Sequence, residues 1–194
     1  MTNQTILITG CSSGIGRITA KYFQQRGWNV VATVRSNPEK DEELNALDNI
    51  LVTELDVTKK DTIDAAIAAG IEHFGKIDVL LNNAGYGSYG LLEATPEHKM
   101  RRQYDVNVIG TMLMMQAILP HFRKRGQGTI INISSMNSFT PLTKIPAYSG
   151  AKAAISNFTK WLAVHMSKVN IRVNAIAPGF FVTDQNRALL MNAD

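Results

Sequence analysis

Apolar residues along this chain follow two patterns, short β-branched runs and longer stretches with helical spacing. The short runs predict strands, and the longer stretches predict amphipathic helices. Six strands are expected, at residues 5–9, 29–34, 50–55, 77–81, 129–133 and 171–176. Helices are expected at residues 15–26, 59–74, 96–125 and 147–167, with a further short helix inside 37–48.

Strands that alternate with helices predict right-handed βαβ units and a parallel sheet that is covered on both faces. We therefore expect a doubly wound α/β fold of three layers (a Rossmann fold), with strand order 3-2-1-4-5-6. Such a sheet binds a dinucleotide beyond the carboxyl ends of its strands, where the strand order reverses. The 194 residues are expected to form one dinucleotide-binding domain.

Two of the expected helices begin with capping signals. Thr58 is followed three residues later by Asp61, an arrangement that resembles a capping box. Thr95 followed by Pro96 predicts an N-cap residue with proline at the first helical position. Both helices are therefore expected to begin with a threonine hydroxyl that accepts a backbone hydrogen bond.

Composition narrows the classes of function. The hydrophobic content of 45% and the charged content of 19% are ordinary for a globular protein. The net charge of +4 is modest and the basic residues are scattered, so no nucleic-acid partner is expected. The single cysteine, Cys11, excludes an intrachain disulfide and favours a reducing, cytoplasmic compartment. The sequence predicts no signal peptide, no membrane span and no metal site.

A glycine-rich loop, Thr9-Gly10-Cys11-Ser12-Ser13-Gly14-Ile15-Gly16, joins the first strand to the first helix. Glycines permit a tight turn and a close approach of the backbone to a pyrophosphate. The helix that follows offers N–H groups and a positive dipole end to the phosphates. A merely structural turn is the alternative, but the strand–turn–helix position favours a nucleotide site. The candidates for cofactor binding here are Gly10, Ser12, Ser13, Gly14, Ile15 and Gly16.

The end of the second strand indicates which cofactor is bound. An acidic side chain there would bind the ribose 2′-hydroxyl and favour NAD(H). This chain instead has Arg35, which can pair with a 2′-phosphate, and nothing acidic follows until Glu39. NADP(H) is therefore favoured, with NAD(H) as the alternative. The loops after the third and fourth strands are expected to border the adenosine, with Asp56, Val57, Asn83, Ala84 and Gly85.

Tyr148 and Lys152 stand four residues apart in a predicted helix, so both project from one face about one turn apart. A lysine at that position is expected to lower the pKa of the phenol from its usual value of about 10. Such a tyrosine can give a proton to a carbonyl oxygen or take one from an alcohol. A pair on the surface is the alternative. Ser135, thirteen residues before the tyrosine, favours a catalytic site.

These motifs, in this order and spacing, resemble those of the short-chain dehydrogenases/reductases over essentially the whole chain. The likeness rests on the glycine loop, on residues 56–57, 82–85, 107, 135 and 148–152, and on Pro178-Gly179. It implies an enzyme that interconverts a small-molecule carbonyl and an alcohol, in which a nicotinamide cofactor carries the hydride. It also implies a homodimer or homotetramer that forms through residues 96–125 and 147–167.

The resemblance implies roles for single residues. Tyr148 would be the general acid/base, and Lys152 would hold the nicotinamide ribose. Ser135 would hydrogen-bond the substrate oxygen, with Ser134 as its competitor for that role. Asn107 would support a water-linked proton path near Lys152. The turn after the sixth strand would contact the nicotinamide end of the cofactor through Pro178, Gly179 and Thr183.

The chain departs from the family pattern in two ways. Family members continue beyond the Pro178-Gly179 turn with a substrate-covering segment and a seventh strand. The chain is therefore expected to be truncated, and a nucleotide-binding but catalytically incomplete fragment is the alternative function. Through about Ser135 it resembles NADP-type carbonyl and hydroxysteroid reductases, whereas from Met136 it resembles mannonate-type sugar-acid oxidoreductases. A hybrid origin is the resulting hypothesis. Residues 139–145 and 180–185 are expected to line the substrate pocket, but they do not identify the substrate.

Overall fold

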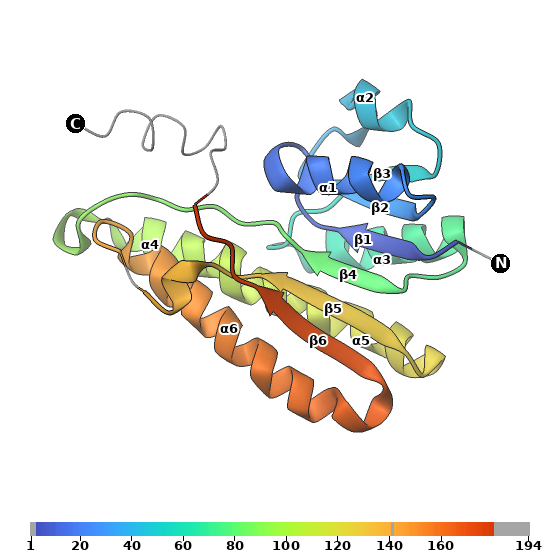
Figure 1. Ribbon diagram of the computed structural model, residues 1–194. Coiled ribbons are helices and arrows are strands. Elements are labelled where there is room, and N and C mark those ends of the chain that lie inside the picture. Colours follow the sequence, from blue (N-terminus) through green and yellow to red (C-terminus); the bar gives the residue numbers. More distant parts are fainter. Residues whose placement is uncertain (1–2, 141, 181–194) are drawn as a thin grey trace.

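The computed structural model describes residues 3–140 and 142–180. Its strands form one parallel sheet in the order β3-β2-β1-β4-β5-β6, which confirms the expected order (Figure 1). The doubly wound Rossmann fold is therefore confirmed as well. The strands are β1 (Thr5–Ile8), β2 (Asn29–Val34), β3 (Ile50–Glu54), β4 (Val79–Asn82), β5 (Gly128–Ile133) and β6 (Ile171–Ile176).

Helices connect successive strands and cover both faces of the sheet (Figure 1). They are α1 (Gly14–Gln24), α2 (Glu42–Asn45), α3 (Lys60–Phe74), α4 (Glu97–Tyr104), α5 (Thr111–Arg125) and α6 (Pro146–Met166). Single 3₁₀ turns lie at Pro38–Lys40, Leu92–Ala94, Met136–Ser138 and Ser167–Val169. None of the described helices is both long enough and apolar enough to cross a bilayer.

The sheet separates two hydrophobic cores, because successive side chains of a strand point to opposite faces. Leu7 of β1 packs in the larger core, which α3, α5 and α6 cover and which contains the buried Phe122. Its neighbours Ile6 and Ile8 pack in the smaller core, beneath α1 and α2. β1 is buried on both faces, as expected of a central strand in a parallel sheet.

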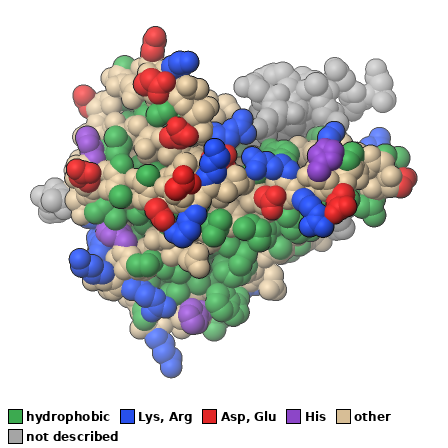
Figure 2. All heavy atoms as spheres, turned by 180° about the vertical axis from the view of Figure 1, so that it is seen from behind, with side chains coloured by type: hydrophobic (Ala, Val, Ile, Leu, Met, Phe, Trp, Pro, Cys, Tyr) green, Lys and Arg blue, Asp and Glu red, His purple; other side chains and the backbone are tan. Residues whose placement is uncertain are grey.

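Hydrophobic side chains also remain exposed on the outside of the helices. Figure 2 shows the face that is turned away in Figure 1, where such side chains gather low on the molecule and charged side chains are scattered above them. Ile109, Trp161 and Val164 are large apolar residues that are exposed on the segment between α4 and α5 and on α6. These three residues belong to the two helical regions in which the sequence predicts subunit contacts.

The predicted start of α3 is wrong. The helix begins at Lys60, its N-cap residue is Lys59, and no side chain caps it. The hydroxyl of Thr58 instead donates a hydrogen bond to Oδ1 of Asp56, at 2.7 Å. The capping box fails because a carboxylate two residues away competes successfully for the threonine hydroxyl.

The predicted start of α4 is displaced by one residue. Pro96 itself is the N-cap residue, with φ of −60° and ψ of 141°, and the helix begins at Glu97. The hydroxyl of Thr95 donates to the carbonyl oxygen of Leu91, at 2.7 Å, so it closes the preceding turn instead of capping the helix.

The single long helix that the sequence predicts over 96–125 is interrupted. A π-helical segment, Asp105–Gly110, separates α4 from α5. Such a segment widens the helix locally and often accompanies a functional site. Here it contains the buried Asn107, and it ends at Gly110, where an added Cβ would lie 2.7 Å from the Val57 side chain. The interruption therefore changes the direction in which Asn107 is presented.

Candidate active site

A cleft of about 980 Å³ lies at the carboxyl ends of the strands and is lined by the segments that follow all six of them. These segments are far apart in the chain and meet because parallel strands end at the same edge of a sheet. This cleft is lined by sixteen of the catalytic and cofactor-binding candidates from the sequence: Gly10, Ser12, Ser13, Gly14, Ile15, Arg35, Asp56, Val57, Asn83, Ala84, Gly85, Ser135, Tyr148, Lys152, Pro178 and Gly179.

Three further sequence candidates are placed differently. Gly16 is buried and does not line the cleft, because it lies against the glycine loop from behind. Asn107 is also buried behind the cleft wall. Thr183 lies outside the described residues.

The glycine loop has the geometry that close contact with phosphate requires. Gly10 and Gly14 have φ of 75° and 57°, values that glycine adopts at little cost. A Cβ on Gly16 would lie 2.2 Å from the carbonyl oxygen of Gly10, so the loop and α1 pack too closely for any side chain there. Ser13 is the N-cap residue of α1 and makes no side-chain cap. The backbone N–H groups of the first turn can therefore bind an anion, and the loop fits a dinucleotide pyrophosphate.

The loop after β4 is fastened to the glycine loop. The backbone N–H groups of Asn83 and Ala84 both donate to the hydroxyl oxygen of Thr9, each at 2.9 Å. The Asn83 amide donates in addition to the carbonyl oxygens of Thr9 and Gly10, at 2.9 and 3.2 Å. These four hydrogen bonds hold two walls of the cleft in one fixed arrangement.

Asn107 uses its side chain to hold a third wall. Its amide donates to the carbonyl oxygen of Tyr86 at 2.8 Å, and its Oδ1 accepts from the Tyr86 N–H at 3.1 Å. A Cβ on Gly85 would lie 2.9 Å from Asn107 Oδ1 and 3.7 Å from Lys152 Nζ. Asn107 and Lys152 therefore both lie beside Gly85, and they leave little room for a side chain at this position.

Lys152 is buried, and its ammonium group donates to the carbonyl oxygen of Ile133 at 2.6 Å. Burial lowers the pKa of this lysine to about 8, because the charged form is poorly solvated. The lysine Nζ is 5.6 Å from the centre of the Tyr148 ring. The ammonium is thus anchored to the backbone at the end of β5, although it faces the same cleft as the phenol.

The expectation that Lys152 lowers the phenol pKa is wrong for this geometry. Burial raises the pKa of Tyr148, and a hydrogen bond with Ser135 opposes that rise only in part. Tyr89 adds a smaller contribution in the raising direction. Desolvation dominates because most of the Tyr148 ring is enclosed by the cleft walls, one of which is the backbone at Gly87.

The two neighbouring serines have different partners. Ser135 lies close enough to Tyr148 to lower the pKa of the phenol, and its Oγ accepts from the Asn137 N–H at 3.2 Å. Ser134 also lines the cleft, but its hydroxyl is bonded to those of Ser138 and Ser156. The geometry therefore associates Ser135, and not its competitor, with the phenol.

The sequence did not indicate the residues that shape the wall opposite Tyr148. Tyr86, Gly87 and Tyr89 line the cleft, and a Cβ on Gly87 would lie 3.5 Å from the Tyr148 ring. Gln103 is fully buried, donates to the Tyr86 carbonyl at 2.9 Å and accepts from the Ser88 hydroxyl at 2.7 Å. The signal for Gln103 was its position four residues before Asn107, which puts two amides on one helix face.

The expected substrate-pocket segments lie partly in place. Leu142, Thr143, Lys144, Ile145 and Phe180 line the cleft. Phe139 and Thr140 do not, and Phe139 is exposed on the surface instead. Residues 141 and 181–185 lie outside the described residues.

Known proteins resemble this chain over much of its length. An uncharacterized oxidoreductase of Haemophilus influenzae is 47% identical over 138 residues, which cover 62% of this chain and 48% of that protein. Glucose 1-dehydrogenase 2 of Bacillus subtilis is 38% identical over 197 residues, which cover 96% of this chain and 75% of that protein. The first match thus spans about half of its relative.

A solved structure extends the likeness to the fold. Gluconate 5-dehydrogenase of Burkholderia cenocepacia, in complex with NADP and tartrate, superposes with a TM-score of 0.91 at 32% identity. The superposition covers all of this chain and 77% of that one. The sequence pattern described as short chain dehydrogenase matches residues 4–193. With nearly every residue inside that match, the chain belongs to the short-chain dehydrogenase family.

Proposed function

We propose that this protein is an NADP(H)-dependent oxidoreductase that interconverts a carbonyl and an alcohol, with Tyr148 as its general acid/base. The observation that carries the proposal is that Tyr148, Ser135 and Lys152 line the same cleft as the glycine loop. A proton-transfer group and a dinucleotide loop are the two parts that such a reaction needs on one surface. The solved gluconate 5-dehydrogenase with NADP supports the choice of reaction class.

When bound, the nicotinamide supplies or accepts the hydride. The side chains of this protein would handle the proton and the oxygen. The raised pKa of Tyr148 keeps its phenol protonated at neutral pH, which suits donation of a proton to a carbonyl oxygen. Ser135, which lines the cleft beside that phenol, would bind the same oxygen and help to polarise the carbonyl. Lys152 would hold the ribose of the nicotinamide, and Asn107 would support the path by which the phenol regains its proton.

The cofactor contacts follow from the cleft walls. The glycine loop and the N-terminus of α1 would hold the pyrophosphate. Asp56 and Val57 would border the adenine, and Pro178 and Gly179 would border the nicotinamide. Arg35 is exposed at the end of β2 and lines the cleft, so it can pair with a 2′-phosphate. That position supports NADP(H) over NAD(H).

The test is the Tyr148→Phe variant, assayed with NADPH and NADP⁺ against sugar acids, polyols and hydrophobic ketones. Loss of the phenol should lower turnover by about a hundredfold or more, because general acid/base catalysis contributes at least that much. Binding of NADPH, followed by fluorescence, should stay within a factor of about two, as the ring remains. Tyr22→Phe on α1 is the matched control, since Tyr22 is exposed and does not line the cleft.

Two outcomes would contradict the proposal. Unchanged turnover in Tyr148→Phe would remove the tyrosine from the mechanism. Tight NADPH binding without turnover on any substrate of the panel would instead favour the alternative, a nucleotide-binding chain that does not catalyse.

A further inference from the structure

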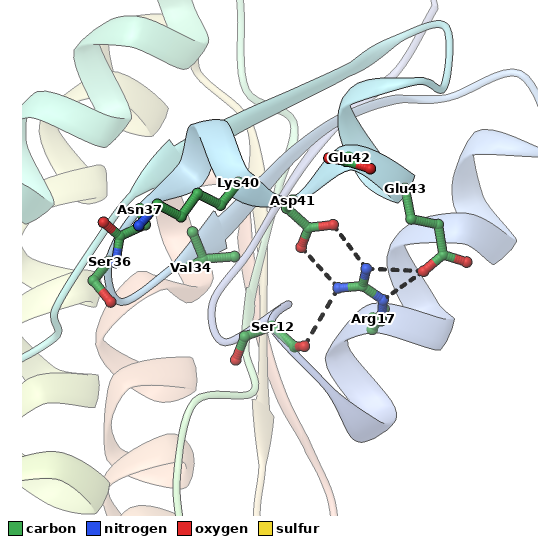
Figure 3. Close-up of a pocket in the computed structure, with 9 residues that line it drawn as sticks. All are labelled: Ser12, Arg17, Val34, Ser36, Asn37, Lys40, Asp41, Glu42 and Glu43. Carbon is green, nitrogen blue, oxygen red and sulfur yellow. Dashed lines mark hydrogen bonds and ion pairs between the residues drawn. The ribbon is translucent and has the colours of Figure 1, made fainter.

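Arg17 of α1 connects the glycine loop to the segment that follows β2 (Figure 3). Its Nη1 and Nη2 atoms each donate to a different oxygen of the Asp41 carboxylate, both at 2.7 Å. Its Nε donates to the Glu43 carboxylate at 2.9 Å. Asp41 is also the N-cap residue of α2, where it accepts from the Leu44 N–H at 3.2 Å. A two-pronged pair of this kind fixes both direction and distance.

The same guanidinium reaches into the glycine loop. Its Nη1 donates to the carbonyl oxygen of Ser12 at 3.3 Å and to that of Cys11 at 3.5 Å. One side chain therefore binds the phosphate loop and the segment 36–43 that follows β2. Between them lies a hollow of about 310 Å³, lined in part by Ser12, Ser36 and Lys40. Because Ser12 and Ser36 line the main cleft as well, the hollow lies next to it.

The pair also balances negative charge at this place. Asp41 and Glu43 line the hollow, beside the loop where a polyanionic cofactor would bind. The hydrogen bonds from Arg17 hold the pKa of Asp41 below its usual value, so this carboxylate is charged at neutral pH. Lys21 forms a further ion pair with Glu43. The Arg17 and Asp41 side chains are only 22% and 11% exposed, so solvent screens their interaction less than that of a surface pair.

We propose that Arg17 is a positioning residue for the cofactor. Its pair with Asp41 fixes the glycine loop against segment 36–43, and it neutralises acidic charge beside the adenosine end of the dinucleotide. This inference rests on the proposed function, since it requires a nicotinamide dinucleotide in the cleft. Loss of Arg17 should therefore have two separable effects. A disturbed glycine loop should weaken the binding of both NADPH and NADH, and the unbalanced acidic charge should weaken the binding of NADPH further, because NADPH carries an extra phosphate.

The test measures dissociation constants for NADPH and NADH by fluorescence or calorimetry, so it does not depend on turnover. Arg17→Met should weaken the binding of both cofactors by about tenfold, because the contact between Arg17 and Asp41 that positions the loop is lost. NADPH should weaken by a further factor of about three, because the Asp41 charge is then unbalanced near its phosphate. Arg17→Met/Asp41→Asn should return the NADPH-to-NADH ratio to the wild-type value while both affinities remain weakened.

Two further variants make the outcome decisive. Lys21→Met removes an ion pair of Glu43 that does not reach the glycine loop, so affinities should change by less than about twofold. Asp41→Asn alone should weaken the binding of NADPH and of NADH to a similar degree. This variant replaces Arg17→Met in the test if Arg17→Met does not fold. Wild-type affinities in folded Arg17→Met or Asp41→Asn, or equal losses in Lys21→Met, would overturn the positioning role. No dinucleotide binding to the wild-type chain would overturn the proposed function itself.

Discussion

The ammonium group of Lys152 donates a hydrogen bond of 2.6 Å to the backbone carbonyl oxygen of Ile133, the last residue of β5. Burial at this position lowers the lysine pKa to about 8, from 10.5 for an exposed lysine. Between these two values the unfolded chain binds one proton more than the folded chain. Stability therefore rises with pH in this window, and the cost of the buried charge is fully present below it.

We accordingly expect the free energy of unfolding of the wild type to rise, relative to Lys152→Met, by about 2 kcal/mol between pH 7 and 9.5. Urea unfolding at several pH values measures it. The pH series ends at about 9.5 because Tyr148 also titrates at higher pH. Its pKa is raised in the folded chain, so the unfolded chain loses the phenolic proton first, and stability falls above about pH 10. Parallel pH profiles for the two proteins would show that Lys152 is not titrating near 8.

Replacing Arg35 by aspartate should change the choice of cofactor. We expect NADPH to bind at least about tenfold more weakly and NADH to bind as well or better. The new carboxylate repels a 2′-phosphate and accepts a hydrogen bond from a 2′-hydroxyl. Dissociation constants for both cofactors measure the shift.

Arg26→Asp is the control for the Arg35 experiment, because Arg26 stacks on Tyr22 at the end of α1 and does not line the cleft. It changes the net charge by the same amount. Equal effects of the two substitutions would mean that overall charge, and not a local contact of Arg35, sets the preference.

Gln103→Met should loosen the cleft wall that faces Tyr148. The change keeps the volume of the side chain but removes its hydrogen bonds to Tyr86 and Ser88. We expect a loss of about 1–3 kcal/mol in stability and a higher KM, together with faster hydrogen exchange at residues 86–88. Ser88→Ala removes one of the two bonds and should have the smaller effect. Unchanged exchange at 86–88 in Gln103→Met would show that Asn107 alone holds this loop.

The exposed apolar surface of α6 supports the expected homodimer or homotetramer. Trp161 and Val164 are 55% and 76% exposed, and Trp161 stacks on His165 with ring centres 5.1 Å apart. Light scattering should give a mass of at least two chains. Val164→Glu should shift it toward one chain, because a buried unpaired charge is costly at an interface.

The control for the subunit contact is Ile18→Glu, which changes an equally exposed apolar residue on α1, across the sheet from α6. It should leave the mass unchanged. A wild-type mass of one chain, or the same mass for wild type and Val164→Glu, would contradict an interface at α6.

Much of the fold could be predicted from the sequence. The β-branched runs and the helical spacing located each strand to within two residues. Because parallel strands need right-handed crossovers, few strand orders are compatible with that succession. Helix starts were less predictable. The hydroxyls of Thr58 and Thr95 had several possible acceptors nearby, and competition among hydrogen bonds within a turn is decided by geometry that a spacing rule does not contain.

The sequence by itself placed the glycine loop, Arg35 and Ser135 at strand ends, which lie at one edge of a parallel sheet, and the family resemblance added Tyr148 and Lys152 to that site. The tertiary structure alone decided their partners and their protonation. The sign of the Tyr148 pKa shift depends on how much water the assembled walls exclude. Lys152 contacts Ile133 across 19 residues of chain, and Arg17 contacts Asp41 across 24. Such contacts exist only once the strands and helices have assembled.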